Sequence, residues 1–396
     1  MVEKMEALHP NLFFKIGDAT FFAEVDAFYE NIPYLTGNEI RAGLLRIAAL
    51  IGDWHTRLIS PHLTDGWFPV RVEKFSDGLF VTAVSTKYSG AYGCKVLQIG
   101  NLTAGDAFEK VQSITSGDNV YSQIYFAPLF FMMSSVMNGL HIVEDEQILY
   151  LLVEDKNGER IELSLEAEPF DSDEFYSWYW LQHAVPTDTY VSIFSDQSEG
   201  LPLYIKHFDS PYWFEYLEEY KTVYMCFNQC ANDESESFAD VNSRLWSYIE
   251  ANPVDRLIID MRHNLGGTNT YLEPLIHGVI KHDRINRKGH FFVLTGRKNV
   301  SAAVQCIAWL EKHCDPIFVG EPTGAPPNHY ADPEFIPLPN SRFNLMVSKW
   351  YWMNTRYPWD DRTWIEPHIQ HQARSEEYFH RKDPALMKIF EYIEKH

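Results

Sequence analysis

The stretch that decides the fold is residues 254–320, VDRLIIDMRHNLGGTNTYLEPLIHGVIKHDRINRKGHFFVLTGRKNVSAAVQCIAWLEKHCDPIFVG. Short apolar runs in it alternate with segments whose apolar residues recur at helical spacing. This alternation is typical of a largely parallel sheet with helices on both faces. TVYMCFNQC at 222–230 and SFADVNSRLWSYIEANP at 237–253 extend the pattern upstream as a strand and a helix. We therefore predict an α/β fold whose core is a mixed, largely parallel sheet within residues 200–396.

Residues 1–64 are predicted to form an N-terminal helical region. Apolar side chains recur at three-and-four spacing in 18–32 and in 36–52, which is typical of amphipathic helices. The candidate N-caps of these helices are Asp18 and either Thr36 or Asn38.

Residues 65–170 are predicted to form a small β-rich domain. Turn residues at 76–78 and 156–158, each between alternating strands, indicate two hairpins. The apolar run FAPLFFMMSSVMNGL at 126–140 is expected to be a core helix. An acidic, aromatic connector is expected at 171–199.

Length and charge limit the possible classes of protein. A chain of 396 residues is expected to form two or three domains. Its formal net charge of −22 argues against a nucleic-acid partner, which would require a basic face to neutralise phosphates. No secretory signal opens the chain, and no run reaches the ~18 apolar residues of a membrane span. We therefore expect a cytoplasmic protein without a membrane span.

The sequence contains no pattern typical of a metal or nucleotide site. The five cysteines are few and odd in number, and are interpreted as buried thiols with no disulfide framework. His368 and His371 form an HxxH pair, but no HExxH motif accompanies them. Neither GxGxxG nor a P-loop occurs. We therefore predict neither a metal nor a cofactor.

Ser301 is the candidate nucleophile. It lies where the predicted strand HFFVLTGRK meets the predicted helix SAAVQCIAWLEKHC. A serine at such a junction is usually an N-cap that accepts hydrogen bonds from the first helical turn. Alternatively, the helix N-terminus stabilises negative charge beside the hydroxyl, with the amide of Ala302 as an oxyanion donor. The pattern GxSxG is absent, so this is not an ordinary α/β-hydrolase.

Two further features are relevant because a serine nucleophile needs a base and an oxyanion site. His55, in IGDWHTRL, follows an apolar helix and is flanked by Asp53 and Thr56, although a helix-end histidine often only satisfies carbonyls. Gly266 and Gly267 follow a buried strand. Paired glycines there indicate either close backbone approach to a ligand or a plain tight turn.

In combination and in chain order, several motifs resemble those of the tail-specific (C-terminal-processing) and tricorn-core serine peptidases. They are GDWHTRL, TVYMCFNQC, LIIDMRHNLGG, VLTGRKNVSAAVQ, FVGEPTG, a hairpin FNLMVSKWYW, and WIEP. The resemblance covers roughly residues 200–370 and reaches His55. It implies a sheet core of the ClpP/crotonase-like type, and a PDZ-like domain within 65–170.

The resemblance also implies roles for individual residues. Ser301 matches the nucleophile and His55 the base, while Ala302, Gly266 and Gly267 match the oxyanion donors. Relatives with a Ser–Lys dyad place the lysine just after the glycine of a TxG segment, where this chain has Ala325 and Pro326. The chain therefore resembles the Ser–His branch, and Lys298, which precedes the helix, is not favoured as the base.

Two acids compete to orient the imidazole, Glu321 in GEPTG and Glu366 in WIEP. We favour Glu366, because the apolar approach through Trp364 and Ile365 would desolvate its carboxylate and the family pattern also places the acid near the end. The chain departs from the tricorn-like pattern E-x-x-G-[VI]-x-P-D, since it reads EPHIQHQ there. It also has Trp54 where the pattern has a serine before the base.

These observations predict a serine-type peptidase that hydrolyses peptides or unfolded protein tails through an acyl-enzyme intermediate. The β-rich region, 65–170, is expected to bind or gate the substrate by strand addition. Two alternatives stay open. One is a catalytically inactive protein of the same fold that binds a peptide or an apolar ligand. The other is a crotonase-like enzyme, which would not require His55 together with Ser301.

Overall fold

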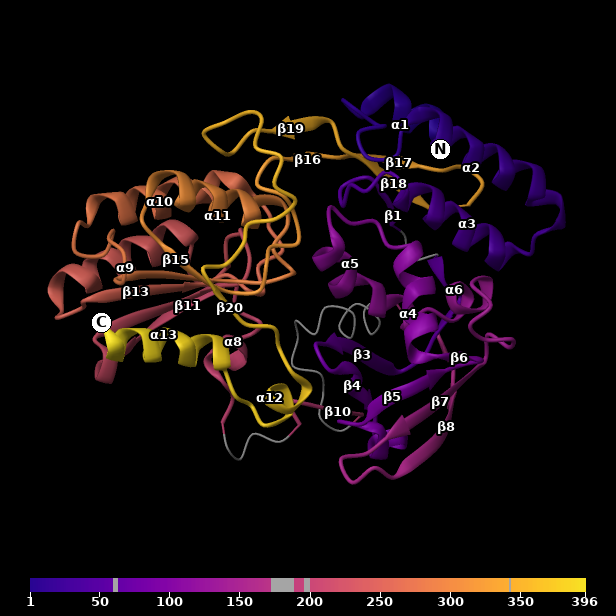
Figure 1. The fold of residues 1–396 in the computed structure, drawn as a ribbon, viewed down its shortest axis with the longest axis horizontal. Coiled ribbons are helices and arrows are strands. Elements are labelled where there is room, and N and C mark those ends of the chain that lie inside the picture. The colour runs from indigo at the N-terminus through magenta and orange to yellow at the C-terminus, as the bar shows by residue number, and fades with distance from the viewer. Residues whose placement is uncertain (60–62, 172–188, 196–199, 342) are drawn as a thin grey trace. The chain divides into compact units, whose positions relative to one another are not determined.

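The structure is a computed structural model that describes residues 1–59, 63–171, 189–195, 200–341 and 343–396 (Figure 1). These residues form two compact units. The first unit comprises Met1–Gly117, Gln123–Glu199 and Tyr330–Tyr351, and the second comprises Asp118–Ser122, Gly200–His329 and Trp352–His396. Residues 330–351, assigned above to the catalytic core, therefore pack in the first unit. The connector predicted at 171–199 lies largely outside the described residues, and the finer domain boundaries remain predictions.

The first unit begins with the helices α1 (Val2–Leu8), α2 (Asp18–Asn31), η1 (Ile32–Tyr34) and α3 (Gly37–Ala49). Thr36 is the N-cap of α3, as predicted, and forms a capping box with Glu39. The Glu39 N–H donates to the Thr36 hydroxyl at 3.3 Å, and the Thr36 N–H donates to the Glu39 carboxylate at 2.7 Å. The N-cap prediction for Asp18 is wrong, because Gly17, with φ 74°, precedes α2 in that position.

The β-rich region contains a seven-stranded antiparallel sheet among the described residues. The order β10–β4–β5–β7–β8 forms its path, with β3 paired to β4 and β6 paired to β5. The strands are β3 (Val70–Phe75), β4 (Gly78–Ser85), β5 (Lys95–Ile99), β6 (Leu102–Thr103), β7 (Ile148–Glu154), β8 (Arg160–Glu166) and β10 (Tyr190–Ser192). The hairpins β3–β4 and β7–β8 confirm the predicted turns. The helices η3 (Thr86–Ala91), α4 (Ala104–Ser113) and α5 (Val120–Phe126) occur between the strands.

The apolar run at 126–140 is not one helix. It forms the 3-10 helix η4 (Ala127–Met132) and the short helix α6 (Ser134–Gly139). Pro128 lies in the first turn of η4, where its missing N–H is tolerated. Met133 is extended, with φ −92° and ψ 100°, and so separates the two helices.

Two small antiparallel sheets complete the first unit. One has the order β1–β18–β17, from β1 (Arg57–Ile59), β18 (Asn344–Val347) and β17 (Glu334–Pro337), and the other pairs β2 (Gly66–Trp67) with β9 (Glu168–Pro169). The predicted hairpin at 343–352 is wrong, because β19 (Trp350–Trp352) pairs with β16 (His329–Ala331) and not with β18. Polar contacts from the residue after β18 explain this: the Ser348 N–H donates to the Thr56 hydroxyl at 3.1 Å, beside β1.

The second unit contains a six-stranded sheet of order β11–β12–β13–β14–β15–β20. Its strands are β11 (Tyr212–Leu217), β12 (Thr222–Phe227), β13 (Arg256–Asp260), β14 (Phe291–Thr295), β15 (Ile317–Gly320) and β20 (Ile369–Gln370). The β11 strand is antiparallel to β12, and every other pair is parallel. The prediction of a mixed, largely parallel sheet is therefore confirmed.

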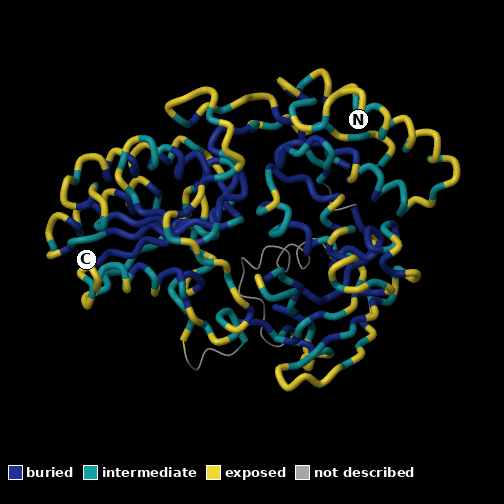
Figure 2. Tube along the Cα trace, in the orientation of Figure 1, coloured by how far each residue is buried: buried dark blue, intermediate teal, exposed yellow. Residues whose placement is uncertain are grey.

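Helices cover both faces of this sheet (Figure 1). The helices α9 (Phe238–Ala251), α10 (Leu272–Lys281) and α11 (Ser301–His313) follow successive strands on one face, and α13 (Pro384–Lys395) lies on the other. Leu386 and Ile389 of α13 pack in one core with alternate strand residues such as Ile258 and Leu294. The strands are buried and the outer helix faces are exposed (Figure 2).

The remaining short helices of this unit are α8 (Leu203–Lys206), η5 (Glu218–Tyr220), η6 (Asn269–Tyr271) and α12 (Ser375–Phe379). None of the helices formed by the described residues combines the length and apolar character needed to cross a bilayer. Because β12 to β15 are parallel, their carboxyl ends meet at one edge of the sheet, where reactive groups collect in such folds.

Candidate active site

The loops that follow β13 and β14 are joined by two buried asparagines. Asn264 donates to the Phe227 carbonyl at 2.8 Å and accepts the Gly266 N–H at 2.9 Å. Asn299 donates to the carbonyls of Met261 at 2.5 Å and Asn264 at 3.0 Å. Both asparagines have an exposed fraction of 0%. These bonds hold the loop that carries the paired glycines against the loop that carries Ser301.

Ser301 is the first residue of α11, but it is not the N-cap of that helix. Val300 occupies the cap position, and no side-chain cap hydrogen bond is present. Ser301 has φ 55°, a left-handed conformation that is costly for residues other than glycine. Strained backbone of this kind is concentrated at functional sites. The capping explanation for this serine is therefore excluded by the geometry.

Of the paired glycines, Gly266 lies directly against Ser301 and Gly267 lies against Cys230. Gly266 has φ 109°, and a Cβ atom there would lie 2.7 Å from the Ser301 Cβ and 2.9 Å from the Ala302 nitrogen. A Cβ on Gly267, with φ 133°, would lie 2.3 Å from the Cys230 carbonyl oxygen. Both positions thus require glycine, for backbone conformation and for space.

The backbone amides of these residues differ in their availability. The Gly266 N–H is engaged by Asn264. The N–H groups of Gly267 and Ala302 donate to no acceptor among the described residues. Ala302 is also in the first turn of α11, where the helix dipole favours negative charge. The second unit therefore has two unused amides in the segments that carry the motif: that of Ala302, which directly follows Ser301, and that of Gly267, which directly follows Gly266.

His55 belongs to the first unit, and a buried carboxylate holds its loop. The His55 N–H donates to Asp53 at 2.9 Å, and the hydroxyls of Thr56 and Ser348 each donate to Asp53 at 2.6 Å. His9 Nε2 lies 3.3 Å from the same carboxylate. Burial alone would raise the pKa of Asp53, but the His9, Ser348 and Thr56 hydrogen bonds and the nearby His55 lower this pKa to about 2.

Trp54 lines the other side of His55, where the family pattern has a serine. The two rings meet edge to face with centroids 4.8 Å apart, and the Arg57 guanidinium lies 3.8 Å from the Trp54 ring centroid. The polar network around Asp53 thus holds the main chain of His55, and the Trp54 ring packs against its imidazole.

The two candidate acids have different surroundings. Glu321 accepts from Arg297 Nε at 2.9 Å and from the Ala373 N–H at 3.4 Å. Glu366 is exposed and accepts from the side chains of Trp364 and Gln370. The predicted desolvation of Glu366 is therefore wrong, because its indole neighbour donates a hydrogen bond to the carboxylate and does not cover it.

Tyr121, which the sequence analysis did not single out, lies near both acids. Its ring meets Trp364 edge to face at 5.1 Å. Burial and the charges of Glu366 and Glu321 raise the pKa of its phenol. Asn119 holds this segment in the second unit by donating to the carbonyls of Thr323 at 3.0 Å and Thr363 at 2.7 Å.

Other candidate groups near the site are accounted for by packing. Lys298 is buried, and its ammonium lies 5.8 Å from the Phe208 ring centroid. Cys226, Cys230 and Cys306 are buried and not in disulfides, and burial raises the pKa of the Cys230 thiol to about 12. The prediction that Cys226 and Cys230 are buried thiols is confirmed.

Solved structures of other proteins share this fold. Mature CPAF matches with a TM-score of 0.66 at 11% identity, over 100% of this chain and 96% of that chain. A serine-to-alanine mutant of CPAF matches with a TM-score of 0.63 at 12% identity, over 100% of this chain and 94% of that chain. The chain has the fold of the tail-specific serine peptidases.

The resemblance of the sequence to these peptidases is thus confirmed at the level of the fold. The photosystem II D1 C-terminal processing protease also matches, with a TM-score of 0.40 at 11% identity, over 97% of this chain and 96% of that chain. No protein-family model and no curated protein matches the chain.

Within this peptidase fold the structure brings Ser301, Ala302, Gly266 and Gly267 together in the second unit, while His55 belongs to the first. Sequence reasoning noted Asp53 as a neighbour of His55 but predicted no supporting role for it, nor for Asn264 or Asn299. Their signal was present as polar residues directly beside the motifs, but their hydrogen-bond partners come from distant parts of the chain.

Proposed function

We propose that this chain is a serine-type peptidase that hydrolyses peptides or unfolded protein tails. The observation that supports this most strongly is the geometry of Ser301. Its hydroxyl is not used as a helix cap, and its backbone is held in a left-handed conformation between the paired glycines and the start of α11.

In the proposed reaction, the Ser301 hydroxyl attacks the carbonyl carbon of the scissile peptide bond while His55 accepts its proton. The negative oxygen of the tetrahedral intermediate accepts hydrogen bonds from the amides of Gly267 and Ala302. The C–N bond then breaks, and His55 returns the proton to the leaving amine. Water, activated by His55, hydrolyses the resulting acyl-enzyme and regenerates the serine.

Two carboxylates support the base in this proposal. Asp53 positions the loop of His55 through the main-chain N–H, Thr56 and Ser348. Glu366 orients the imidazole: its hydrogen bonds come from the neutral side chains of Trp364 and Gln370, whereas Glu321 is held in an ion pair with Arg297. Glu321 stays the alternative acid.

The test is covalent labelling of the full chain with a fluorophosphonate, followed by peptide mass spectrometry. We expect one adduct on Ser301, with labelling strongly reduced in His55→Ala. A protein that does not label, or that labels at other serines equally, would favour the catalytically inactive binding protein. Mature CPAF has also been solved in complex with lactacystin, which makes this compound a second probe.

In this proposal the partner of the protein is a peptide or protein substrate, and no nucleic acid binds. The proposal also includes a cytoplasmic location and a PDZ-like domain within residues 65–170. The acidic charge of −22 supports the exclusion of nucleic acid.

A further inference from the structure

A groove of about 370 Å³ lies on the second unit, beside α10 and the C-terminal part of α11. Its apolar lining consists of Ile276, Ile280, Trp309, Trp352 and Met353. The volume is within the roughly 300–1,000 Å³ of ligand pockets. The rise of an α-helix places Lys312, at this groove, roughly 16 Å along α11 from Ser301. The groove is thus distinct from the candidate active site.

The wall of the groove after β19 is held rigidly. The buried Asn354 donates through its side chain to the Pro327 carbonyl and through its N–H to the Asn328 side chain, both at 2.8 Å. Arg356 donates to the Lys312 carbonyl at 2.6 Å. Met353 is nevertheless 58% exposed on this ordered segment. Together with Ile276, Ile280, Trp309 and Trp352, Met353 forms a contiguous apolar lining, and exposed apolar patches of this kind mark interaction sites.

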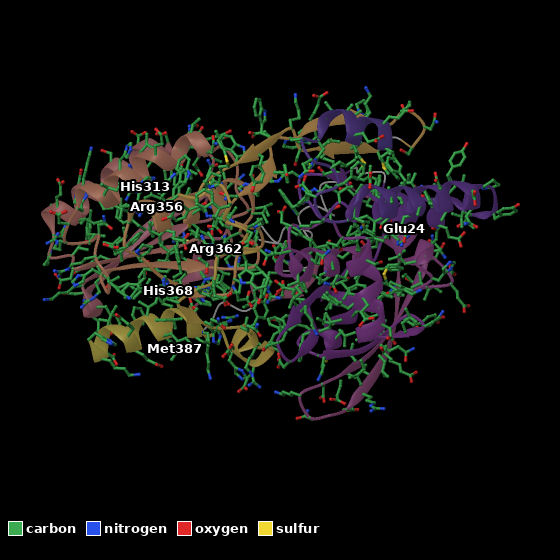
Figure 3. All side chains as sticks on the ribbon, turned by 45° about the horizontal axis from the view of Figure 1, so that its top comes forward. Glu24, His313, Arg356, Arg362, His368 and Met387 are labelled. Atoms are coloured by element: carbon green, nitrogen blue, oxygen red, sulfur yellow. The ribbon has the colours of Figure 1, made fainter. Side chains whose placement is uncertain are left out.

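Four basic side chains, here called the cationic cluster, line the groove or lie beside it, and two of them, His313 and Arg356, are labelled in Figure 3. They are His277, Lys312, His313 and Arg356. Burial, together with the charges of Lys312, Arg356 and His277, lowers the pKa of His313. These groups are therefore close enough to repel one another.

The cationic cluster is not neutralised by the protein itself. Among the described residues, no carboxylate forms an ion pair with any of its four members, although the chain has 55 acidic residues. Glu311, next to Lys312 in the sequence, is bound instead by both terminal nitrogens of Arg362, at 2.8 and 2.7 Å. Glu273 is the one acidic side chain among the described residues that line the groove. Lys312 and Arg356 are the two permanently charged members of the cluster, and on a chain of net charge −22 two cations without a carboxylate partner among the described residues favour an anionic ligand.

We propose that this groove binds an acidic peptide segment that also carries apolar side chains. Its carboxylates would contact the cationic cluster, and a branched or aromatic side chain would lie between Trp309, Trp352 and Met353. The open groove follows one stripe of α10, where Ile276 and Ile280 are one turn apart, so it accommodates an extended or helical peptide. The proposal does not depend on peptidase activity.

The test measures peptide binding by fluorescence anisotropy on the full chain carrying Ser301→Ala, so that no cleavage can occur. The probe is a labelled ten-residue peptide of Asp, Glu, Leu and Phe. There are two matched control peptides. In one, Lys replaces the acidic residues, and in the other, Ser replaces Leu and Phe. We expect only the probe peptide to bind well, with at least tenfold weaker binding after Lys312→Glu and fivefold weaker binding after Met353→Asp. Lys312→Arg should retain binding, and Lys395→Glu, at an exposed side chain near the end of α13, is the control that leaves it unchanged.

Several outcomes would overturn the proposal. They are equal binding of the lysine peptide, no binding of the acidic peptide at millimolar concentration, or full binding by both Lys312→Glu and Met353→Asp. Self-association of the chain that Met353→Asp abolishes, measured by sedimentation, would assign the groove to a second copy instead. Labelling of Ser301 by the fluorophosphonate is unaffected by any of these results, so the two proposals fail separately.

Discussion

The substitutions Ser301→Gly and Ser301→Ala distinguish the effect of backbone strain on stability from the effect of the hydroxyl on catalysis. The φ of 55° at Ser301 costs a residue with a Cβ roughly 1–2 kcal/mol, and glycine avoids this cost. Glycine also has more conformational freedom in the unfolded chain, and losing this freedom on folding offsets roughly 0.5–1 kcal/mol of the stability gained by relieving the strain. We therefore expect Ser301→Gly to raise the free energy of unfolding by about 0.5–1 kcal/mol. Ser301→Ala should leave it within about 0.5 kcal/mol, because no cap bond is lost. Both variants should lose turnover.

The assay is urea unfolding followed by tryptophan fluorescence, with kcat measured on a peptide that the parent cleaves. Ser237 provides a matched control in the same unit, because it is the N-cap of α9 and accepts the Asp240 N–H at 3.2 Å. Ser237→Ala should therefore lose about 1 kcal/mol with turnover retained. If Ser301→Ala lost as much stability as Ser237→Ala, or if Ser301→Gly were less stable than the parent, the reasoning from strain would be refuted.

The remaining predictions concern the carboxylates. The pKa of Asp53 is lowered from 3.8 to about 2, so its ionised form stabilises the fold by about 2 kcal/mol above pH 3.8, and this contribution is lost as the pH falls toward 2. Asp53→Asn should therefore lower the free energy of unfolding by about 2 kcal/mol at pH 7 and by progressively less below pH 3.8. Urea unfolding at several pH values measures this, and a difference between parent and variant that does not change with pH would contradict it. Glu366→Gln should reduce kcat by up to ~10⁴, as expected for a triad acid. Glu321→Gln should mainly reduce stability, because Arg297 loses its partner, and a larger kcat loss in this variant would transfer the acid role to Glu321.

Local patterns predicted most of the regular structure because their causes are local. Periodicity within short windows predicts the strands and helices of 222–320. Capping residues predict the N-terminus of α3 at Thr36, and turn residues predict the two hairpins. The single helix expected at 126–140 failed where a proline and an extended methionine interrupt an otherwise apolar run. The hairpin expected at 343–352 failed because strand pairing depends on distant partners.

By itself, the sequence determined the α/β class and the largely parallel character of the sheet in the second unit. It also identified Ser301, His55 and the paired glycines as candidates. Only the tertiary structure decided that Val300 and not Ser301 caps α11, and that Gly266 has its amide engaged while Gly267 does not. It also decided that Glu321 is bound by Arg297, and that Asp53 holds the His55 loop with Ser348. The physical reason is that each of these facts depends on the exact backbone geometry or on which donor meets which acceptor, and for Glu321 and Asp53 the partners Arg297 and Ser348 are distant in the chain. Periodicity and propensity record only the preferences of neighbouring residues.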